Sequence, residues 1–394
     1  MRNFFLSFFK TKQKLYTKLI IFSFLIVNTF FNFGGWEDCC EKYFGCNFGS
    51  KKEEEENVKK NQNIFGNIQG EPIDINNSEN FNTLSVVFGI ILGNDLNPTE
   101  NVNIENIQEE EKFDQFKVSI EDFTFCVKLL KGNYEEIKEN HISNNALNQG
   151  TANLYTLREK PNFLNFYGSY IFQNRVFICI DYCDGGDLKT FIDNLSLAEI
   201  NSELYKSFSR QLFNILQILR ENKITHRDIK LENFFVIKNN NNPEIVLGDF
   251  SLSQYGGNEE DGNLKCIKRF SYGLDFFYKS PIYRQFFLDL ISHKAEKIDS
   301  YNAYNEDLFA VALILYYLKN EKKYPTFIGE VLNLEKMNQK NLLEKTIQDF
   351  NNYFNSDDYK NHDGELYNKI FLKFKDKNNN DTIDINEFIN GPNP

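Results

Sequence analysis

The sequence has no surplus of basic side chains: 44 lysines and arginines stand against 56 aspartates and glutamates, for a formal net charge of −12. Such a chain lacks the positive field that attracts phosphate backbones, so no nucleic-acid partner is expected. Its seven cysteines include no four with the spacing of zinc ligands, and nothing in them requires a disulfide framework. The composition thus gives no support to a nucleic-acid-binding protein, a zinc protein or a disulfide-stabilised scaffold.

The chemistry that is present lies in the run His226-Arg227-Asp228-Ile229-Lys230-Leu231-Glu232-Asn233. Residues 203–221 before it carry apolar side chains at helical spacing, which predicts a helix that leads into a loop. Residues 234–237 are predicted to form the next strand. Asp249 follows Asp228 by 249 − 228 = 21 residues, a gap that fits a β-hairpin. The hairpin would bring Asp249 back beside Asn233.

Phosphoryl transfer requires such a set of groups. A carboxylate must orient the attacking hydroxyl, and a cation must neutralise the transferring phosphoryl group. Asp228 and Lys230 are the candidates for these two roles. A second carboxylate and an amide must hold Mg²⁺ against the phosphates, and Asp249 and Asn233 can supply them.

These residues resemble the protein kinase superfamily, whose catalytic loop reads H-R-D-x-K-x-x-N and whose metal motif reads D-F-G. The second motif here is Asp249-Phe250-Ser251, and Lys230 is similar to the serine/threonine class. The resemblance implies an α+β, two-lobed fold over residues 81–394, with a small β-rich N-lobe at 81–181 and a larger helical C-lobe at 184–394. It also implies ATP and Mg²⁺ as cofactors, a protein substrate, and Asp228, Lys230 and Asn233 as catalytic residues.

The resemblance also assigns the nucleotide site. Lys128, at the end of Phe125-Cys126-Val127-Lys128, is similar to the strand lysine of V-A-I-K and would contact the α- and β-phosphates. The backbones of Asp181 and Cys183 would bind adenine as an interlobe hinge, and Asp187 could reach the ribose. In the N-lobe, residues 84–92 read as a β-like run, and residues 116–120 with 123–130 read as a hairpin.

Four features of the family are missing. No glycine lies between Gly93 and Gly132, where the phosphate loop belongs, and that stretch contains Gln108-Glu109-Glu110-Glu111, whose carboxylates would repel phosphates. No acid lies between Asn140 and Arg158 to pair with Lys128. Ser251 replaces a glycine and Ile282 replaces a glutamate. A kinase of low activity, or a pseudokinase scaffold that binds nucleotide, is therefore the alternative to an active enzyme.

The C-terminal run has two interpretations. As an EF-hand loop at 376–387, its calcium ligands would be Asp376, Asn378, Asn380, Thr382, Asp384 and Glu387, which would make the kinase calcium-responsive. Alternatively, the run joins the last two helices of the C-lobe, with Ile383, Phe388 and Ile389 facing the core. Both interpretations remain open at this point.

The N-terminus predicts targeting. Residues 1–18 are basic and carry no acid, and an almost wholly apolar stretch follows, so residues 1–35 read as a signal peptide or a membrane anchor. Residues 36–80 read as a charged, Asn-rich linker. The prediction is a membrane-associated or secretory-pathway protein, with its sidedness open.

Overall fold

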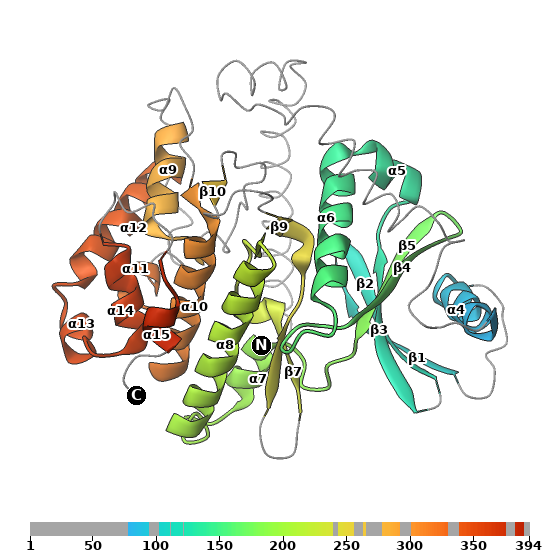
Figure 1. Ribbon diagram of the computed structural model, residues 1–394, viewed down its shortest axis with the longest axis horizontal. Helices are drawn as coiled ribbons and strands as arrows, with labels where there is room; N and C mark the ends of the chain where they lie inside the picture. Colours follow the sequence, from blue (N-terminus) through green and yellow to red (C-terminus); the bar gives the residue numbers. More distant parts are fainter. Residues whose placement is uncertain are drawn as a thin grey trace, which may run out of the picture.

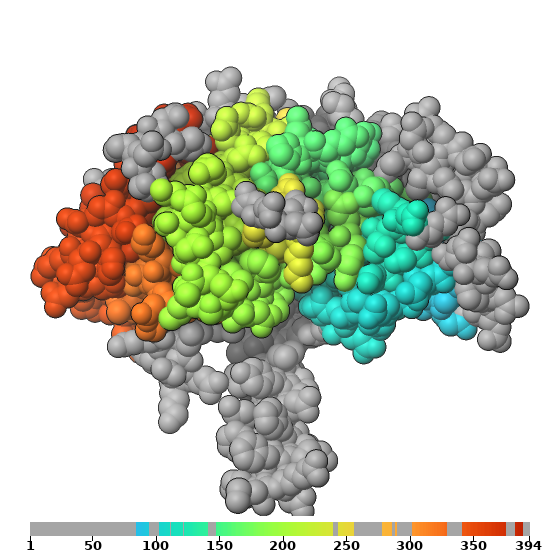
Figure 2. Space-filling view, turned by 90° about the horizontal axis from the view of Figure 1, so that it is seen from below, coloured from blue at the N-terminus to red at the C-terminus, as the bar shows by residue number. Residues whose placement is uncertain are grey.

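The computed structural model describes residues 78–93, 102–110, 112–120, 122–238, 243–255, 263–264, 278–291, 301–329, 339–375 and 383–389. The largest sheet lies in one part and most helices lie in the other, so the predicted α+β, two-lobed architecture is confirmed (Figure 1). In Figure 2 the strand-rich part (cyan and blue) and the C-terminal helices (orange and red) lie at opposite ends. The predicted targeting segment lies outside the described residues, among which no helix is long and apolar enough to cross a membrane.

The strand-rich lobe is built on one antiparallel sheet with the order β1-β2-β3-β5-β4. Its strands are β1 (Val102–Glu109), β2 (Phe113–Ile120), β3 (Phe123–Leu130), β4 (Phe166–Phe172) and β5 (Arg175–Asp181). The predicted hairpin is confirmed as β2 and β3, and its register pairs Phe116 with Val127 and Gln115 with Lys128. Because side chains alternate along a strand, Val127 and Lys128 lie on opposite faces of the sheet.

Helix α4 (Ser78–Ile91) covers the outer face of this sheet (Figure 1). The β-like run predicted for residues 84–92 is therefore wrong. Leu84, Val87 and Phe88 recur at helical spacing and are buried against the apolar face of the sheet. A short apolar run suits a buried strand or a buried helix equally well, so the packing against the sheet decides its conformation.

Helices α5 (Tyr134–Glu139) and α6 (His141–Leu157) follow β3. Leu154 and Leu157 of α6 are buried in the same apolar cluster as Ile178 of β5. Ile178 is also the register partner of Lys128. The inner face of the sheet, which carries Lys128, therefore faces α6 and the rest of the molecule.

The helix-rich lobe begins with α7 (Leu188–Asn194) and α8 (Ser202–Glu221), so the helix predicted over residues 203–221 is confirmed. Short elements follow: β6 (Ile224–Thr225), η1 (Leu231–Asn233), β7 (Phe234–Ile237), β8 (Glu244–Leu247), η2 (Phe250–Leu252), β9 (Gln254–Tyr255) and β10 (Asn263–Leu264). The later elements are α9 (Pro281–Ile291), β11 (Tyr301–Asn302), α10 (Ala303–Lys319), α11 (Thr326–Gly329), α12 (Gln339–Tyr353), α13 (Asp357–Asn361), α14 (Leu366–Lys373) and α15 (Asn386–Ile389).

Helix α10 forms the centre of this lobe. All of its residues from Ala303 to Leu318 are buried, as expected for a helix that is apolar on nearly every side. The ring of Phe309 lies 5.9 Å from that of Phe350 in α12 and 5.4 Å from that of Phe371 in α14. Aromatic contacts therefore hold α12 and α14 against the N-terminal half of α10.

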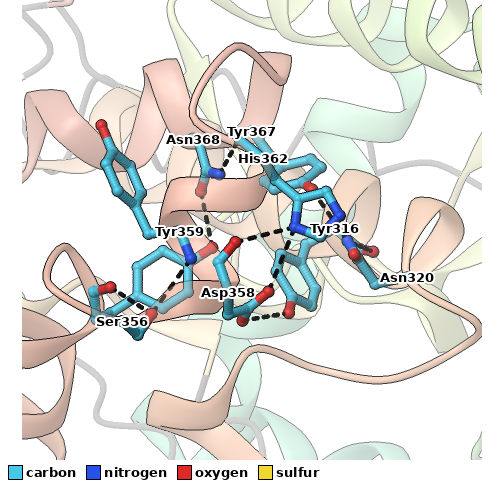
Figure 3. Close-up of polar contacts among 9 residues, drawn as sticks. Tyr316, Asn320, Ser356, Asp358, Tyr359, His362, Tyr367 and Asn368 are labelled. Carbon is cyan, nitrogen blue, oxygen red and sulfur yellow. Dashed lines mark hydrogen bonds and ion pairs between the residues drawn. The ribbon is translucent and has the colours of Figure 1, made fainter.

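Polar side chains complete the packing around α10, as Figure 3 shows. The Tyr316 hydroxyl donates to the Asp358 carboxylate at 2.6 Å, and the Asn320 amide donates to the Tyr367 hydroxyl at 3.2 Å. The Asn368 amide donates to the backbone carbonyl of the loop after α13 at 2.6 Å. Since polar groups that leave water must find partners, these contacts satisfy the polar atoms of the helix junction and have a structural role.

Candidate active site

The loop of residues 226–233 is held in place by an aspartate of α10. The buried Asp307 carboxylate accepts from the backbone N–H groups of His226 at 2.7 Å and Arg227 at 2.8 Å. Arg227 has a left-handed backbone with φ 67°, which is costly for a residue other than glycine and so needs external support. Burial raises the pKa of Asp307, although these hydrogen bonds and the neighbouring cations oppose the rise. The loop conformation therefore depends on a residue far away in sequence.

Three predicted side chains meet in this loop. The Asn233 amide donates to the Asp228 carboxylate at 2.8 Å and to the Asp228 carbonyl at 2.7 Å. The Lys230 ammonium lies 3.3 Å from the same carboxylate oxygen. Because the Nδ2 atom of Asn233 points at Asp228, its Oδ1 atom is the one with which Asn233 could bind a metal ion.

The β7–β8 hairpin brings Asp249 back to this loop, as its spacing predicts. The Gly248 N–H donates to the Asn233 carbonyl at 2.9 Å, and the Asp249 carboxylate accepts from the Ser251 N–H at 3.3 Å. Burial alone would raise the pKa of Asp249, but the nearby Lys128 ammonium and the Ser251 hydrogen bonds hold it below its ordinary value. Asp249 is therefore ionised at neutral pH, as a ligand of a hard cation must be.

Phe250 anchors the metal motif in the core. Its ring centroid lies 4.8 Å from that of His226 in an edge-on contact and 6.3 Å from that of Phe163. A ring nitrogen of His226 is hydrogen-bonded to the Gly248 carbonyl at 2.8 Å. The motif is thus tied to the catalytic loop on one side and to the junction of the two lobes on the other.

The phosphate side of the site departs from the family pattern. Strand β1 ends at Glu109, Glu110 follows it in the turn to β2, and the Glu110 N–H donates to the Phe113 carbonyl at 2.9 Å. Helix α6 carries no aspartate or glutamate. The Lys128 ammonium instead lies over the Phe113 ring, 3.6 Å from its centroid. The glycines missing from the sequence are thus missing from the β1–β2 turn, and the missing acid is missing from α6, which are the two places where the family pattern requires them.

The three predicted hinge residues lie at the end of β5 and on the segment that leads from it to α7. The Asp181 carboxylate accepts from the Asn165 N–H at 2.9 Å. The Asp187 carboxylate caps α7, since it accepts from the Thr190 N–H at 2.8 Å and from its hydroxyl at 2.7 Å. Burial, together with the nearby Asp181, raises the pKa of the Cys183 thiol. Both carboxylates are thus engaged in local hydrogen bonds, and adenine binding by the backbones of Asp181 and Cys183 stays a prediction.

Sequence reasoning missed a buried charged cluster beside the catalytic loop. The Lys279 ammonium donates to the Arg227 carbonyl, and the Arg284 Nε donates to the Lys279 carbonyl at 3.0 Å. Glu306 accepts from the Ser280 N–H at 2.8 Å and from its hydroxyl at 2.5 Å. Burial lowers the pKa of Lys279 and lowers that of Arg284 to about 10. The sequence contained a signal for this cluster. Lys279 and Arg284 lie among apolar residues around the start of α9, and Glu306 lies in the first turn of the apolar α10. Because buried charges need partners of opposite charge, such residues are expected to pair.

The residue expected to be glutamate near this cluster, Ile282, is partly buried and packs against the main apolar core. It therefore uses an apolar contact where the family uses an ion pair.

The described end of the C-terminal run docks on the helix-rich lobe. Ile383 is buried, its N–H donates to the Asn305 side chain at 3.0 Å, and its carbonyl accepts from Arg220 at 2.7 Å. The Phe388 ring stacks at 6.4 Å on that of Phe213. These contacts agree with the interpretation that Ile383 and Phe388 close the lobe.

Four of the six candidate calcium ligands, Asp376, Asn378, Asn380 and Thr382, lie outside the described residues. Of the other two, the Asp384 carboxylate accepts from the Asn386 N–H at 2.9 Å, and Glu387 pairs with Lys373 at 2.6 Å. Within the described ranges, no group of three histidine, cysteine or acidic side chains could hold a metal ion.

Comparison with known proteins places this geometry in context. The family described as "Protein kinase domain" matches residues 119–371. "Serine/threonine-protein kinase ATG1a" of Arabidopsis thaliana is 32% identical over 96 residues, which are 24% of this chain and 15% of that protein. "Serine/threonine-protein kinase Nek5" of Homo sapiens is 33% identical over 107 residues, which are 27% of this chain and 15% of that protein. "Serine/threonine-protein kinase ULK3" of Xenopus laevis is 27% identical over 161 residues, 36% of this chain and 34% of that protein. The matches thus span well under two thirds of each relative.

Proposed function

Because the matched domain covers more than half of it, the chain belongs to the protein kinase family, and we propose that it transfers the γ-phosphate of ATP to serine or threonine hydroxyls of protein substrates. The observation that carries this proposal is the convergence of Asp228, Lys230 and Asn233 in one buried loop. The β7–β8 hairpin brings Asp249, whose carboxylate is ionised, beside this loop.

The residues present fit Mg²⁺ and ATP. Mg²⁺ prefers oxygen ligands and is usually bound through one or two carboxylates together with substrate phosphates. The Asp249 carboxylate and the Asn233 Oδ1 atom form such a donor set. When bound, ATP with Mg²⁺ supplies the transferable phosphoryl group, and Lys128 supplies a cation for its phosphates.

The remaining residues act on the acceptor. The Asp228 carboxylate would accept a hydrogen bond from the substrate hydroxyl, aim its oxygen at the phosphoryl group and take up its proton. Lys230, 3.3 Å from that carboxylate, places a positive charge where negative charge grows during transfer. Asp307 keeps the loop rigid, so that these groups need not reorganise during the reaction.

Two substitutions test the proposal. Asp228→Asn should lower the transfer rate by about 10²–10⁴-fold, the usual contribution of a positioned acid or base, while ATP affinity stays nearly unchanged. Asp249→Asn should instead weaken Mg²⁺-dependent ATP binding. Asp363→Asn is the matched control, because Asp363 is exposed and distant in sequence from the site. Transfer by the Asp228→Asn protein at the wild-type rate would refute the assignment.

A pseudokinase is the second candidate, and the phosphate side of the site favours it. Glu109 ends β1 and Glu110 begins the turn to β2, and α6 supplies no carboxylate for Lys128. Weak transfer or none is the outcome expected from such a site. Binding of Mg²⁺-ATP without phosphate transfer to any peptide, or to the protein itself, would decide for this candidate.

Two further proposals concern regulation and location. Calcium would act through residues 376–387, and the contacts of Ile383 and Glu387 give that idea no support beyond its ligand pattern. Residues 1–35 would direct the protein to a membrane or the secretory pathway. Fractionation of a tagged full-length protein tests the second proposal, and a wholly soluble, cytosolic protein with residues 1–35 intact would contradict it.

A further inference from the structure

The contact between Lys128 and Phe113 follows from the sheet register. Phe113 pairs with Leu130 and Gln115 pairs with Lys128, so the two residues are diagonal neighbours on adjacent strands. Both lie on the inner face, because Val127 packs with α4 on the outer one. Diagonal neighbours are within reach of aromatic and long side chains. The ammonium accordingly lies 3.6 Å from the ring centroid.

Helix α6 could not easily provide a carboxylate in place of this ring. None of its residues is acidic. At Gly150, an added Cβ atom would lie 3.0 Å from the Phe250 carbonyl oxygen, so any side chain there would push on the backbone of the metal motif by a few tenths of an ångström. A longer side chain at this position would press on the Phe250 backbone, so α6 meets the metal motif where its side chain is smallest.

We propose that Phe113 is the positioning residue of Lys128: its ring face holds the ammonium by a cation–π contact and takes the place of the missing helix carboxylate. The inference rests on the proposed function, because it concerns how the nucleotide site is organised. A ring face attracts a cation through its quadrupole but carries no charge. Lys128 thus keeps its whole positive charge for Asp249 and for nucleotide phosphates, with no carboxylate nearby on α6 to compete.

Graded fluorination of the ring tests the contact. Fluorine withdraws electron density from the ring face with little change in shape, so affinity for Mg²⁺-ATP should fall stepwise with mono-, di- and trifluorophenylalanine at position 113. Phe113→Leu should weaken Mg²⁺-ATP binding by about tenfold, which corresponds to about 1.4 kcal/mol. Phe113→Tyr, which keeps an aromatic ring, should bind Mg²⁺-ATP as the wild type does. Phe116→Leu is the matched control, since Phe116 lies on the same strand but packs toward α4.

A second measurement does not depend on nucleotide. The ε-methylene protons of Lys128 should show an upfield ring-current shift in NMR spectra of the wild type and the Phe113→Tyr protein, and lose it in the Phe113→Leu protein. Absence of that shift in the wild type would overturn the inference. So would ATP affinity that is indifferent to both fluorination and Phe113→Leu. A wild-type protein that shows the shift but binds no Mg²⁺-ATP would contradict the proposed function instead.

Discussion

A methyl group added to Gly150 would lie 3.0 Å from the carbonyl oxygen of Phe250, so α6 and the metal motif meet backbone against backbone. The contact is fixed a turn later by Asn153, whose amide donates to the buried Ser253 hydroxyl at 2.7 Å. The Ser253 hydroxyl in turn donates to the Phe250 carbonyl at 2.6 Å. A shift of α6 is therefore expected to move the backbone of the metal motif, and Asp249 with it.

Gly150→Ala should weaken Mg²⁺-ATP binding several-fold. The methyl group must displace either α6 or the Phe250 backbone, and the second moves Asp249 away from Asn233. The free energy of unfolding should fall by about 0–2 kcal/mol, because overpacking costs about 1–3 kcal/mol and alanine returns about 1 kcal/mol of helix propensity. Gly364→Ala is the control, since nothing lies within 4 Å of an added Cβ atom there. Equal ATP affinity in the two variants would contradict the coupling.

Glu306→Gln should flatten part of the pH dependence of stability. Burial raises the pKa of Glu306 above its ordinary 4.5, although Ser280 and Lys279 oppose the rise. The folded protein therefore keeps this proton to a higher pH than the unfolded chain does. It follows that the free energy of unfolding falls as pH rises from about 4.5 through the raised pKa.

Glutamine does not titrate and can still accept from the Ser280 N–H. Urea unfolding from about pH 4.5 to about pH 8 should thus show a smaller fall for Glu306→Gln than for the wild type. Glu139→Gln, at an exposed position, should follow the wild-type profile. Parallel profiles for Glu306→Gln and the wild type would show that the pKa of Glu306 is not raised in the folded protein.

Phe88→Ala should destabilise the strand-rich lobe by about 3–5 kcal/mol, the usual cost of removing a buried phenylalanine. Phe88 is buried in α4, and its ring stacks on that of Phe177 at 4.3 Å. Phe123→Ala, at a residue with 51% of its surface exposed, should cost much less. Chemical denaturation of both proteins measures the difference, and equal losses would mean that α4 is not part of the folded lobe.

The motifs that sequence analysis located are short and local. Asp228, Lys230 and Asn233 lie within six residues, and Asp249 returns through a hairpin whose two strands can be read from the chain. The spacing alone therefore predicted that they would gather. The missing acid of α6 was also visible, because an absence over a whole helix needs no knowledge of packing.

What the sequence did not show depends on residues far apart. The bond from the His226 N–H to Asp307 spans 81 positions, and nothing near either residue signals it. The conformation of residues 84–92 was misjudged for a related reason, since only the sheet that α4 covers selects helix over strand. The Lys128–Phe113 contact likewise requires the strand register, which a one-residue slip would abolish.

The last prediction separates calcium binding from closure of the helix-rich lobe. Ile383→Ala should cost about 2–5 kcal/mol, because Ile383 is buried and its backbone is bonded on both sides, to Asn305 and Arg220. Glu387→Gln should cost at most about 1 kcal/mol, since it removes only a partly exposed ion pair with Lys373.

Calorimetry with calcium and with a chelator completes this test. If the run closes the lobe, the melting temperature is the same in both solutions, and Ile383→Ala lowers it in both. If the run binds calcium, the ion must raise the melting temperature by mass action, and Glu387→Gln must remove the rise. Because Ile383 packs in the core while Glu387 lies on the surface, a calcium-dependent rise that Glu387→Gln removes separates the two interpretations, and the contacts of Ile383 favour the first.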